Sequence, residues 1–403
     1  MRCLAAVVSL ALIACAAATA AGPAAIGSRL THALASPSLS LAQTAALAVD
    51  VQTGAIVFAH NDTLPVAPAS NEKIPVSWAA LTRLGVGYRF HTEVYGSGTR
   101  SGATWDGDLF LKGFGDPTLT RADLDRLAAT IRGRGIRKVT GSVLGDESFY
   151  DKRRGAVGWK HGFVGIESPP LSALIVDRAA GWPALSPPLL AARAYRDALG
   201  RHGISVEGRP GLGIVPAAAT SLASDKSDPL AEIVRRMNHE SDNFYAEMLL
   251  KQLLAATGRV GTSSGGGKLV LATMRDAGIP TDGVHLADGS GLSSLDRLTA
   301  TALVGVIRAG ATDPAIREAF VGSLAVAGVS GTLSDRLPKL RGKVRGKTGT
   351  TDLACALSGL VRSTTAFAVL ENGRPISSHA ARAAQDRFVT ILASDLAATV
   401  PTG

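Results

Sequence analysis

The sequence is poor in cysteine. It has 403 residues but only three cysteines, of which Cys355 alone lies beyond the first 20 residues. One thiol can form neither an intramolecular disulfide nor a cysteine metal cluster, so we expect packing to hold the core. Cys355 lies in the apolar run 354–360. A buried, unreactive thiol is therefore a simpler interpretation than a catalytic one.

Histidines at metal-ligand spacing are also missing. No His-Glu-x-x-His string and no other pair of histidines at ligand spacing on a helix occurs, so the sequence predicts no metal site and no cofactor. Aromatic residues make up 5% of the chain, and no basic run interleaves with them although the net charge is +9. We therefore predict no nucleic-acid groove and read the charge as favouring polyanionic surroundings.

Long hydrophobic stretches are absent as well, apart from a short one at the N-terminus. Residues 1–20 resemble an export signal, with Arg2, an apolar run over 4–14 and small residues at 18–20. The run is too short to span a bilayer, so we predict a removed signal peptide and a protein in the periplasm or at the outer face of the cell envelope. Residues 12–15 also resemble a lipobox. A lipid anchor on Cys15 therefore stays open, and it is the only membrane attachment considered.

Three short strings carry most of the chemical information, namely Ser70-Asn71-Glu72-Lys73, Ser241-Asp242-Asn243 and Lys347-Thr348-Gly349-Thr350. They offer a serine nucleophile with a lysine one helical turn away, a second hydroxyl with an amide, and a basic strand edge that can bind a carboxylate. Each string alone is a common helix start, loop or turn. Their order, spacing and surroundings together predict a serine peptidase site.

The surroundings can be read from turn and helix signals. We predict a helix from Ser70 to about Leu84, ended by Gly85, which places Ser70 and Lys73 on one face. A helix over 121–134 should begin at Thr120 with Asp123 in a capping box. Further elements are predicted from hydrophobic periodicity: strands 47–51, 55–59, 342–347, 354–361 and 364–370, and helices 228–237, 244–254 and 380–396.

The helical and strand segments at both ends are separated by a region of short strands and Gly-rich turns. We therefore predict an α/β fold in which a catalytic domain is built from residues 27–89 and 217–400, with residues 90–216 as an inserted second domain. Ser70 begins a helix in this scheme, Ser241 lies in a loop between two helices, and Lys347 ends a strand.

The chain resembles the serine D-Ala-D-Ala carboxypeptidases and endopeptidases known as class C low-molecular-mass penicillin-binding proteins. The resemblance extends over nearly the whole mature chain. Besides the three strings it rests on residues 68–71, 115–119, 288–293, 326–333 and 356–359. Phe114 departs from the family, which more often has Gly there, and the insert is shorter than in members that carry a third domain. The resemblance implies the penicillin-binding, β-lactamase-like transpeptidase fold, an antiparallel sheet with helices on both faces.

The resemblance also implies roles for the site residues. Ser70 is the nucleophile and Lys73 its base, with a pKa lowered by burial and by a second cation such as Lys347. The backbone N–H groups of Ser70 and Thr350 form the oxyanion hole. Ser241 relays a proton to the leaving group and Asn243 orients Lys73. Lys347, Thr348 and Thr350 hold the substrate carboxylate, and Gly349 lets substrate lie against the strand.

The substrates implied are peptidoglycan stem peptides, with β-lactam antibiotics as inhibitors that acylate Ser70. Two alternatives remain. A β-lactamase shares much of this chemistry, but no Glu-x-x-Leu-Asn string of the class A type occurs. A non-catalytic cell-wall-binding protein would have no need for the full set of catalytic residues. Carboxypeptidase and endopeptidase activity are not distinguished.

Three other segments are interpreted as structural. The string 265–268 lacks two residues of a phosphate-binding loop and is predicted to be a flexible turn before a helix at Leu269. The string 288–293 is predicted to be a structural loop near the rim of the site. His239 is predicted to be a partly exposed loop residue.

Overall fold

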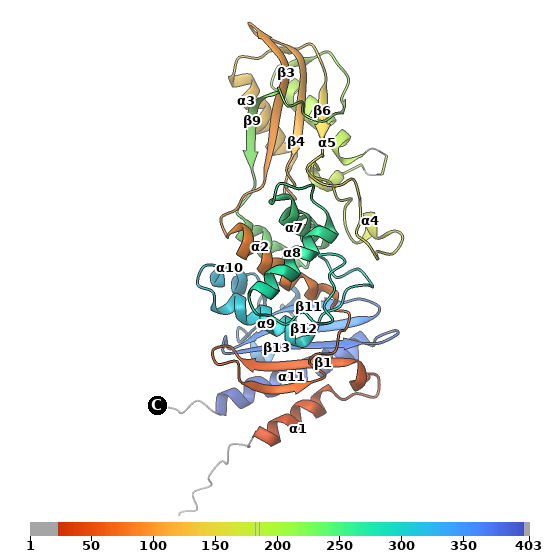
Figure 1. Cartoon of the computed structure of the whole chain (residues 1–403), viewed down its shortest axis with the longest axis vertical. Helices are drawn as coiled ribbons and strands as arrows, with labels where there is room; N and C mark the ends of the chain where they lie inside the picture. Colours follow the sequence, from red (N-terminus) through yellow and green to blue (C-terminus); the bar gives the residue numbers. More distant parts are fainter. Residues whose placement is uncertain (1–22, 182, 185, 399–403) are drawn as a thin grey trace, which may run out of the picture.

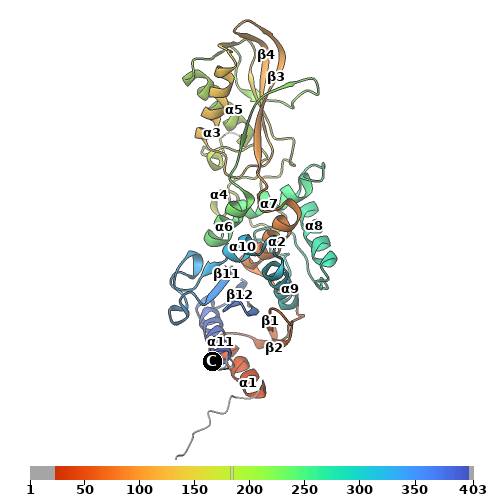
Figure 2. The same cartoon turned by 90° about the vertical axis from the view of Figure 1, so that its left-hand side faces the viewer.

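A computed structural model describes residues 23–181, 183–184 and 186–398. The predicted signal peptide and Cys15 lie outside these residues. The molecule is elongated, with a second sheet at one end and helix α1 at the other, as the two views in Figures 1 and 2 agree. Among the described residues, no helix has the length and apolar character needed to cross a membrane.

The first sheet has six strands, all antiparallel to their neighbours. Its order is β10 (Ala325–Val326), β11 (Val344–Thr350), β12 (Ala354–Val361), β13 (Thr365–Asn372), β1 (Thr44–Asp50) and β2 (Ile56–His60). The strands from the end of the chain lie beside those from its beginning. This sheet is therefore assembled from both ends of the sequence.

Both faces of this sheet are apolar and covered by helices. Alternate residues of β1 point to opposite faces, so Leu47 and Val49 join one core cluster while Ala46 and Ala48 join another. The first cluster is completed by α2 (Lys73–Leu84), α6 (Leu230–Glu240), α7 (Asn243–Ala255), α8 (Ser263–Asp276), α9 (Ala300–Thr312) and α10 (Arg317–Gly322), and the second by α1 (Pro23–Leu34) and α11 (Ser378–Ala398). This arrangement confirms the predicted fold class.

The second sheet is mixed and has its own core. Its path is β7 (Ser205–Val206), β5 (Lys138–Val139), β4 (Thr104–Gly113), β3 (His91–Ser101) and β9 (Thr220–Lys226), and β6 (Val143–Asp146) pairs with β4 and with β8 (Gly211–Leu212). Helices α3 (Arg121–Gly133) and α5 (Pro187–Arg201) pack on it, and the short α4 (Phe163–Ile166) lies nearer the first sheet. The capping box of Thr120 and Asp123 is present at α3 as predicted.

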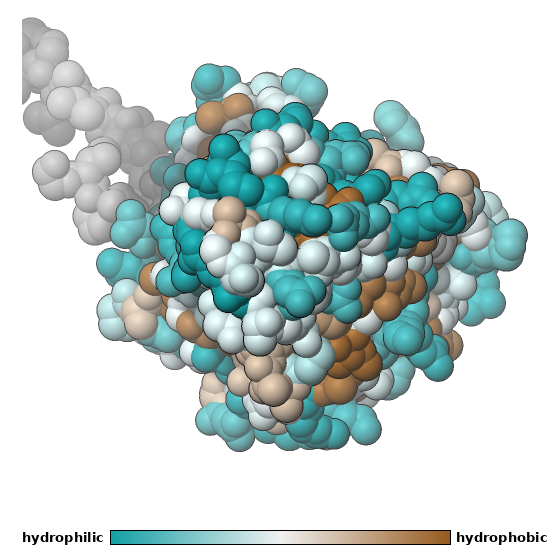
Figure 3. Space-filling view, turned by 90° about the horizontal axis from the view of Figure 1, so that it is seen from above, coloured by the Kyte–Doolittle hydropathy of each residue, from teal (hydrophilic) through white to brown (hydrophobic). Residues whose placement is uncertain are grey.

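We propose that this second body is the inserted domain and that it ends near Lys226. The sequence placed the boundary at residue 216, but β9 pairs with β3 along its length and so belongs to the second sheet. Viewed from this end, hydrophilic residues cover much of the surface and hydrophobic ones form smaller patches (Figure 3). Exposed arginines at this end include Arg100, Arg134 and Arg137.

The glycine run at 265–267 is part of a helix, so the predicted flexible turn is wrong. Helix α8 begins at Ser263 with Thr262 as its N-cap, and Gly266 is buried within its first turns. A methyl group added to Gly266 would come within 1.9 Å of the carbonyl oxygen of Leu250 in α7. The glycines let α7 and α8 pack closely, and this packing outweighs the low helix propensity of glycine.

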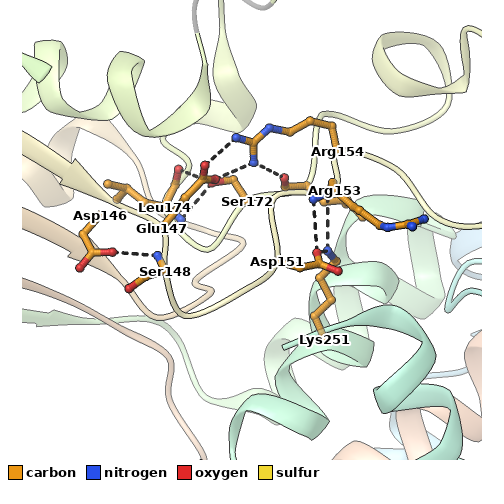
Figure 4. Close-up of polar contacts among 10 residues, drawn as sticks. Asp146, Glu147, Ser148, Asp151, Arg153, Arg154, Ser172, Leu174 and Lys251 are labelled. Atoms are coloured by element: carbon orange, nitrogen blue, oxygen red, sulfur yellow. Dashed lines mark hydrogen bonds and ion pairs between the residues drawn. The ribbon is translucent and has the colours of Figure 1, made fainter. Parts of the chain in front are cut away.

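An ion pair between Lys251 and Asp151 ties the insert to α7 (Figure 4). The Lys251 ammonium on α7 contacts the Asp151 carboxylate and lies 3.4 Å from the Arg153 carbonyl oxygen. Nearby, the Arg154 guanidinium donates to both oxygens of Glu147 at 2.6 and 2.7 Å, and Ser172 donates to Glu147 as well. The Lys251 contacts hold Asp151 and Arg153 against the helix that carries Asn243, and the Glu147 contacts stabilise the same segment within the insert.

Asp151→Ala should lower the free energy of unfolding by about 3 kcal/mol, because it leaves the fully buried Lys251 without its counter-ion. The measurement is urea unfolding followed by circular dichroism. The double variant Asp151→Ala, Lys251→Met should recover most of the loss, since it removes the stranded charge. Equal stability of the single variant and the wild type would contradict this account.

Candidate active site

Ser70 lies at the junction between a short 3-10 turn and a buried helix. The turn η2 (Ala69–Glu72) leads directly into α2, which begins at Lys73 and ends at Gly85 with a positive φ. Ala69 is held at φ 47°, a left-handed conformation that costs a non-glycine residue on the order of 1 kcal/mol. The turn presents the partly exposed Ser70 and brings Lys73 beneath it.

The Lys73 ammonium contacts three oxygen acceptors. Its Nζ lies 3.0 Å from Ser70 Oγ, 2.8 Å from Asn243 Oδ1 and 2.6 Å from the Ser290 carbonyl oxygen. The side chain is completely buried, and this burial lowers the pKa of Lys73 to about 8 against the opposing effect of nearby acids, led by Asp288 and Glu247. A lysine with this pKa can exist as a neutral amine near neutral pH.

The second string joins two helices through a very short connection. Helix α6 ends at Glu240 and α7 begins at Asn243, so the predicted loop is reduced to Ser241 and Asp242. Ser241 adopts a left-handed conformation (φ 60°), and Asp242 caps α7 by accepting from the Tyr245 amide. The sharp joint places Ser241 Oγ 2.8 Å from Lys347 Nζ.

The third string lies inside a strand, so the prediction that Lys347 ends a strand is wrong. β11 continues to Thr350 and pairs with β12 in register throughout. A methyl group on Gly349 would meet the Ser70 backbone nitrogen at 2.8 Å and the Ala69 Cβ at 3.0 Å. Pairing with β12 and close packing against the turn that carries Ser70 explain why this Thr-Gly-Thr run is a strand.

Lys347 is a second fully buried lysine. Its Nζ donates to Ser241 Oγ and to the Thr348 carbonyl oxygen, both at 2.8 Å. Burial, followed by the charge of Lys73, lowers the pKa of Lys347 well below its usual value. Burial is thus the leading cause of the lowered pKa of both lysines, and repulsion between their two charges acts in the same direction.

The outer edge of β11 is open beside the site in the described part of the chain, because β10 pairs only with Arg345 and Gly346. Thr348 Oγ1 donates to Thr332 Oγ1 at 2.7 Å. Thr350 Oγ1 accepts from the exposed Arg382 guanidinium of α11 at 3.4 Å. Arg382 is a further cation near the predicted carboxylate site that the sequence did not indicate.

A cavity of about 590 Å³ lies next to Ser70. Its lining includes Ala69, Thr350, Leu292, Ser293, Phe163 and Glu167, and thus comes from the first sheet, the 288–293 loop and the insert. Lys160 of the insert forms an exposed ion pair with Asp352 in the turn after β11, with 2.5 Å between Nζ and Oδ2. The cavity is large enough for part of a peptide substrate.

The insert contributes directly to the site, which the sequence analysis did not foresee. Its Glu167 carbonyl oxygen accepts from Asn243 Nδ2 at 3.0 Å, and Arg178 donates to the Asp242 carboxylate at 2.7 Å. Trp159 Nε1 donates to the buried Asp288 carboxylate at 2.8 Å. A backbone carbonyl has no residue-type signature, so the Glu167 contact could not be read from the sequence.

The 288–293 string reaches from beneath Lys73 to the cavity wall, where Leu292 and Ser293 lie. Asp288 and Ser290 are completely buried, and the Ser290 carbonyl oxygen is one of the three acceptors around Lys73. His239 lies in the last turn of α6, so the prediction that it lies in a loop is wrong. Cys355 is buried in β12, and burial raises the pKa of its thiol.

No group of three or more His, Cys, Asp or Glu side chains within residues 23–398, as far as these are described, is placed to hold a metal ion. The residues brought together are instead two buried lysines, two serines and an asparagine. Their hydrogen bonds form two groups, in which Lys73 contacts Ser70, Asn243 and the Ser290 carbonyl, and Lys347 contacts Ser241.

The chain is similar to known proteins over most of its length. The model of the D-Ala-D-Ala carboxypeptidase 3 (S13) family matches residues 27–188 and 183–395. The chain is 33% identical to carboxypeptidase DacB of Mycolicibacterium smegmatis, over 92% of this chain and 84% of that protein. It is 28% identical to the D-alanyl-D-alanine carboxypeptidase of Actinomadura sp. (strain R39), over 91% and 84% of the two chains.

The fold is similar to that of penicillin-binding protein 4 from Haemophilus influenzae, whose crystal structure matches with a TM-score of 0.80 at 23% identity. That match covers 92% of this chain and 98% of the other. Family model, relatives and fold thus extend over nearly all described residues. The chain belongs to the D-Ala-D-Ala carboxypeptidase 3 (S13) family.

Proposed function

We propose that this protein is a serine D-Ala-D-Ala carboxypeptidase that trims peptidoglycan stem peptides through an acyl-enzyme on Ser70. The observation that carries the proposal is the placement of Lys73 Nζ, 3.0 Å from Ser70 Oγ and held by two further acceptors. Two relatives that match most of the chain are named as carboxypeptidases. A nucleophile with a buried base at this distance is suited to acyl transfer.

Acylation follows from the contacts of a neutral Lys73. Its two N–H groups donate to Asn243 Oδ1 and to the Ser290 carbonyl, which leaves the nitrogen lone pair directed at the Ser70 hydroxyl. Ser70 Oγ attacks the carbonyl carbon of the penultimate D-Ala while its proton passes to Lys73. The backbone N–H groups of Ser70 and Thr350 stabilise the oxyanion.

Collapse of the tetrahedral intermediate then breaks the peptide bond. Ser241, which accepts a hydrogen bond from Lys347, passes its proton to the departing amine and is reprotonated with the proton that Lys73 took from Ser70, so D-Ala leaves and Lys73 is neutral again. Lys347, Thr348 and Thr350 hold the terminal carboxylate at the open edge of β11. Water then attacks the ester carbonyl, with Lys73 as base, which releases the shortened peptide and restores Ser70.

The same site would react with β-lactams. Ser70 attacks the strained lactam carbonyl, but the leaving amine stays tethered and hinders water, so the ester persists. The Haemophilus influenzae penicillin-binding protein 4 has been solved in complex with a β-lactam, which supports this part of the proposal. A β-lactamase would instead release the opened antibiotic rapidly.

We also propose that the protein acts outside the cytoplasm, where its peptide substrates are found. The apolar run of residues 4–14 supports export. Whether Cys15 carries a lipid is decided by the mass of the mature N-terminus, which differs between a cleaved soluble chain and an acylated one.

The test of the proposed function is release of D-Ala from a pentapeptide that ends in D-Ala-D-Ala, followed by chromatography. We expect release by the wild type and none by Ser70→Ala. A cross-linked peptide dimer in the same assay reports endopeptidase activity. Absence of D-Ala release by a folded wild-type chain would overturn the proposal, and fast turnover of penicillin would favour the β-lactamase alternative.

The rate of acylation by penicillin should rise with pH and level off above about 8. Lys73 must be neutral to accept the Ser70 proton, and its pKa is lowered to about 8. Below that pH the protonated fraction grows, so the rate falls up to tenfold for each unit of pH. Stopped-flow acylation between pH 6 and 9 measures this profile. A flat profile would argue against Lys73 as the base.

A further inference from the structure

The direction of the Lys73 lone pair depends on a backbone carbonyl. A neutral lysine has two N–H groups, and here the acceptors for them are Asn243 Oδ1 and the Ser290 carbonyl oxygen. When both bonds are made, the remaining tetrahedral position of Nζ faces Ser70 Oγ. If the Ser290 carbonyl moved away, the amine would be free to rotate, and the lone pair would no longer be held toward the serine.

Two buried carboxylates fix that carbonyl. The peptide unit between Ser290 and Gly291 presents its C=O to Lys73 and its N–H to Asp288 Oδ1, at 2.6 and 2.7 Å. On the other side, Glu247 Oε1 accepts from the amides of Gly289 and Ser290, both at 2.9 Å. Side chains therefore hold the loop by hydrogen bonds on both sides of the Ser290 carbonyl.

Glu247 and Asn243 lie on the same face of α7, four residues apart. One turn of α7 thus carries Asn243, which is an acceptor for Lys73, and Glu247, which holds the loop that provides the Ser290 carbonyl. Glu247 is completely buried and has an Oε2 without a hydrogen-bond partner among the described residues. A buried carboxyl group is costly to keep, so a role beyond packing is expected.

We propose that Glu247 is a positioning residue, which aims the Ser290 carbonyl at Lys73 and thereby directs the base toward Ser70. The inference rests on the proposed function, since it concerns the same base. Asp288 supports the loop from the opposite side. Neither carboxylate touches the nucleophile, so both act through Lys73.

The charged groups around Lys73 affect its pKa. The groups that face it are Glu72 on the preceding turn, Asp242 and Glu247 on α7, and Asp288 in the loop, with Lys347 on β11 coupled to it. Burial and the Asp288 charge raise the pKa of Glu247 to about 8. An ionised Glu247 favours the protonated form of Lys73, so removing it should lower the pKa of Lys73.

The experiment compares Glu247→Ala with Glu247→Gln in the full chain, using penicillin as the acylating probe. Glutamine keeps an oxygen that can accept both loop amides, whereas alanine keeps none. We expect Glu247→Ala to lower the maximal acylation rate by about 10²-fold, the effect of misplacing a catalytic group by about 1 Å. The concentration of penicillin at half-maximal rate should change little, because Glu247 does not line the cavity.

Glu247→Gln should retain a maximal rate close to that of the wild type. Its pH profile should reach half-maximum at only slightly lower pH, because Glu247 is only partly ionised near pH 8. Gln252→Ala is the matched control. It removes a buried polar side chain of the same helix, bonded to Tyr88 and Tyr150, and should destabilise the fold without changing the acylation rate of folded protein.

Two results would overturn the inference. One is a Glu247→Ala variant that folds and acylates as fast as the wild type and the Gln252→Ala control. The other, which applies even if the alanine variant fails to fold, is a Glu247→Gln variant whose maximal acylation rate falls by about 10²-fold although it keeps the side-chain oxygen. Failure of the wild type itself to form an adduct would instead refute the proposed function.

Discussion

Lys73→Met should slow acylation of Ser70 by about 10⁴-fold, the upper range for loss of a general base. Methionine fills the buried space without a charge, so the fold should persist. The loss would arise because no other base lies within hydrogen-bond distance of Ser70 Oγ in the described part of the chain. The measurement is the rate of covalent adduct formation with penicillin. Lys343→Met, an exposed lysine just before β11, is the control and should acylate normally.

A Lys73→Met variant that acylates within tenfold of the wild type would contradict the assignment of Lys73 as the base. Loss of native circular dichroism would point to a structural role. The variant should also lose the pH dependence expected below about pH 8, because that dependence belongs to the Lys73 amine.

Lys347→Met should lower D-Ala release by about 10³-fold through loss of the buried cation that would pair with the substrate carboxylate. Lys347 is fully buried and hydrogen-bonded to Ser241, so it also supports the group proposed to protonate the leaving amine. Release is measured on a pentapeptide and on the same peptide with its terminal carboxylate converted to an amide.

The amide separates the two contributions of Lys347. The wild type should discriminate strongly against the amide, whereas Lys347→Met should act on both peptides at similar low rates. If the variant still preferred the free carboxylate as strongly as the wild type does, Lys347 would not be the carboxylate-binding group, and Arg382 near Thr350 would be the next candidate.

Local signals were sufficient for much of the fold. Gly85 ends α2 and the Thr120 capping box begins α3, as expected from residues close in sequence. The strands β12 and β13 also fall where their apolar runs predict. Two of the wrong predictions involve glycine. Gly266 lies inside a helix and Gly349 inside a strand because each allows a close approach to a distant segment.

In the site, too, some contacts could be predicted from the sequence and others could not. The pairing of Ser70 with Lys73 is a matter of helical spacing and could be predicted locally, while the place of Ser241 and Lys347 beside them came from the family resemblance. The contacts of Lys73 with the Ser290 carbonyl and of Asn243 with the Glu167 carbonyl could not be predicted. They depend on main-chain atoms that are brought in by folding and that any residue type could supply.

The most direct test of the account is intact mass spectrometry of the chain after incubation with penicillin. The account predicts that the wild type gains the mass of one penicillin molecule, that the adduct maps to the peptide containing Ser70, and that Ser70→Ala gains nothing. An adduct on Ser70→Ala, or no adduct on a folded wild-type chain, would contradict the claim that Ser70 is the nucleophile of a penicillin-sensitive peptidase.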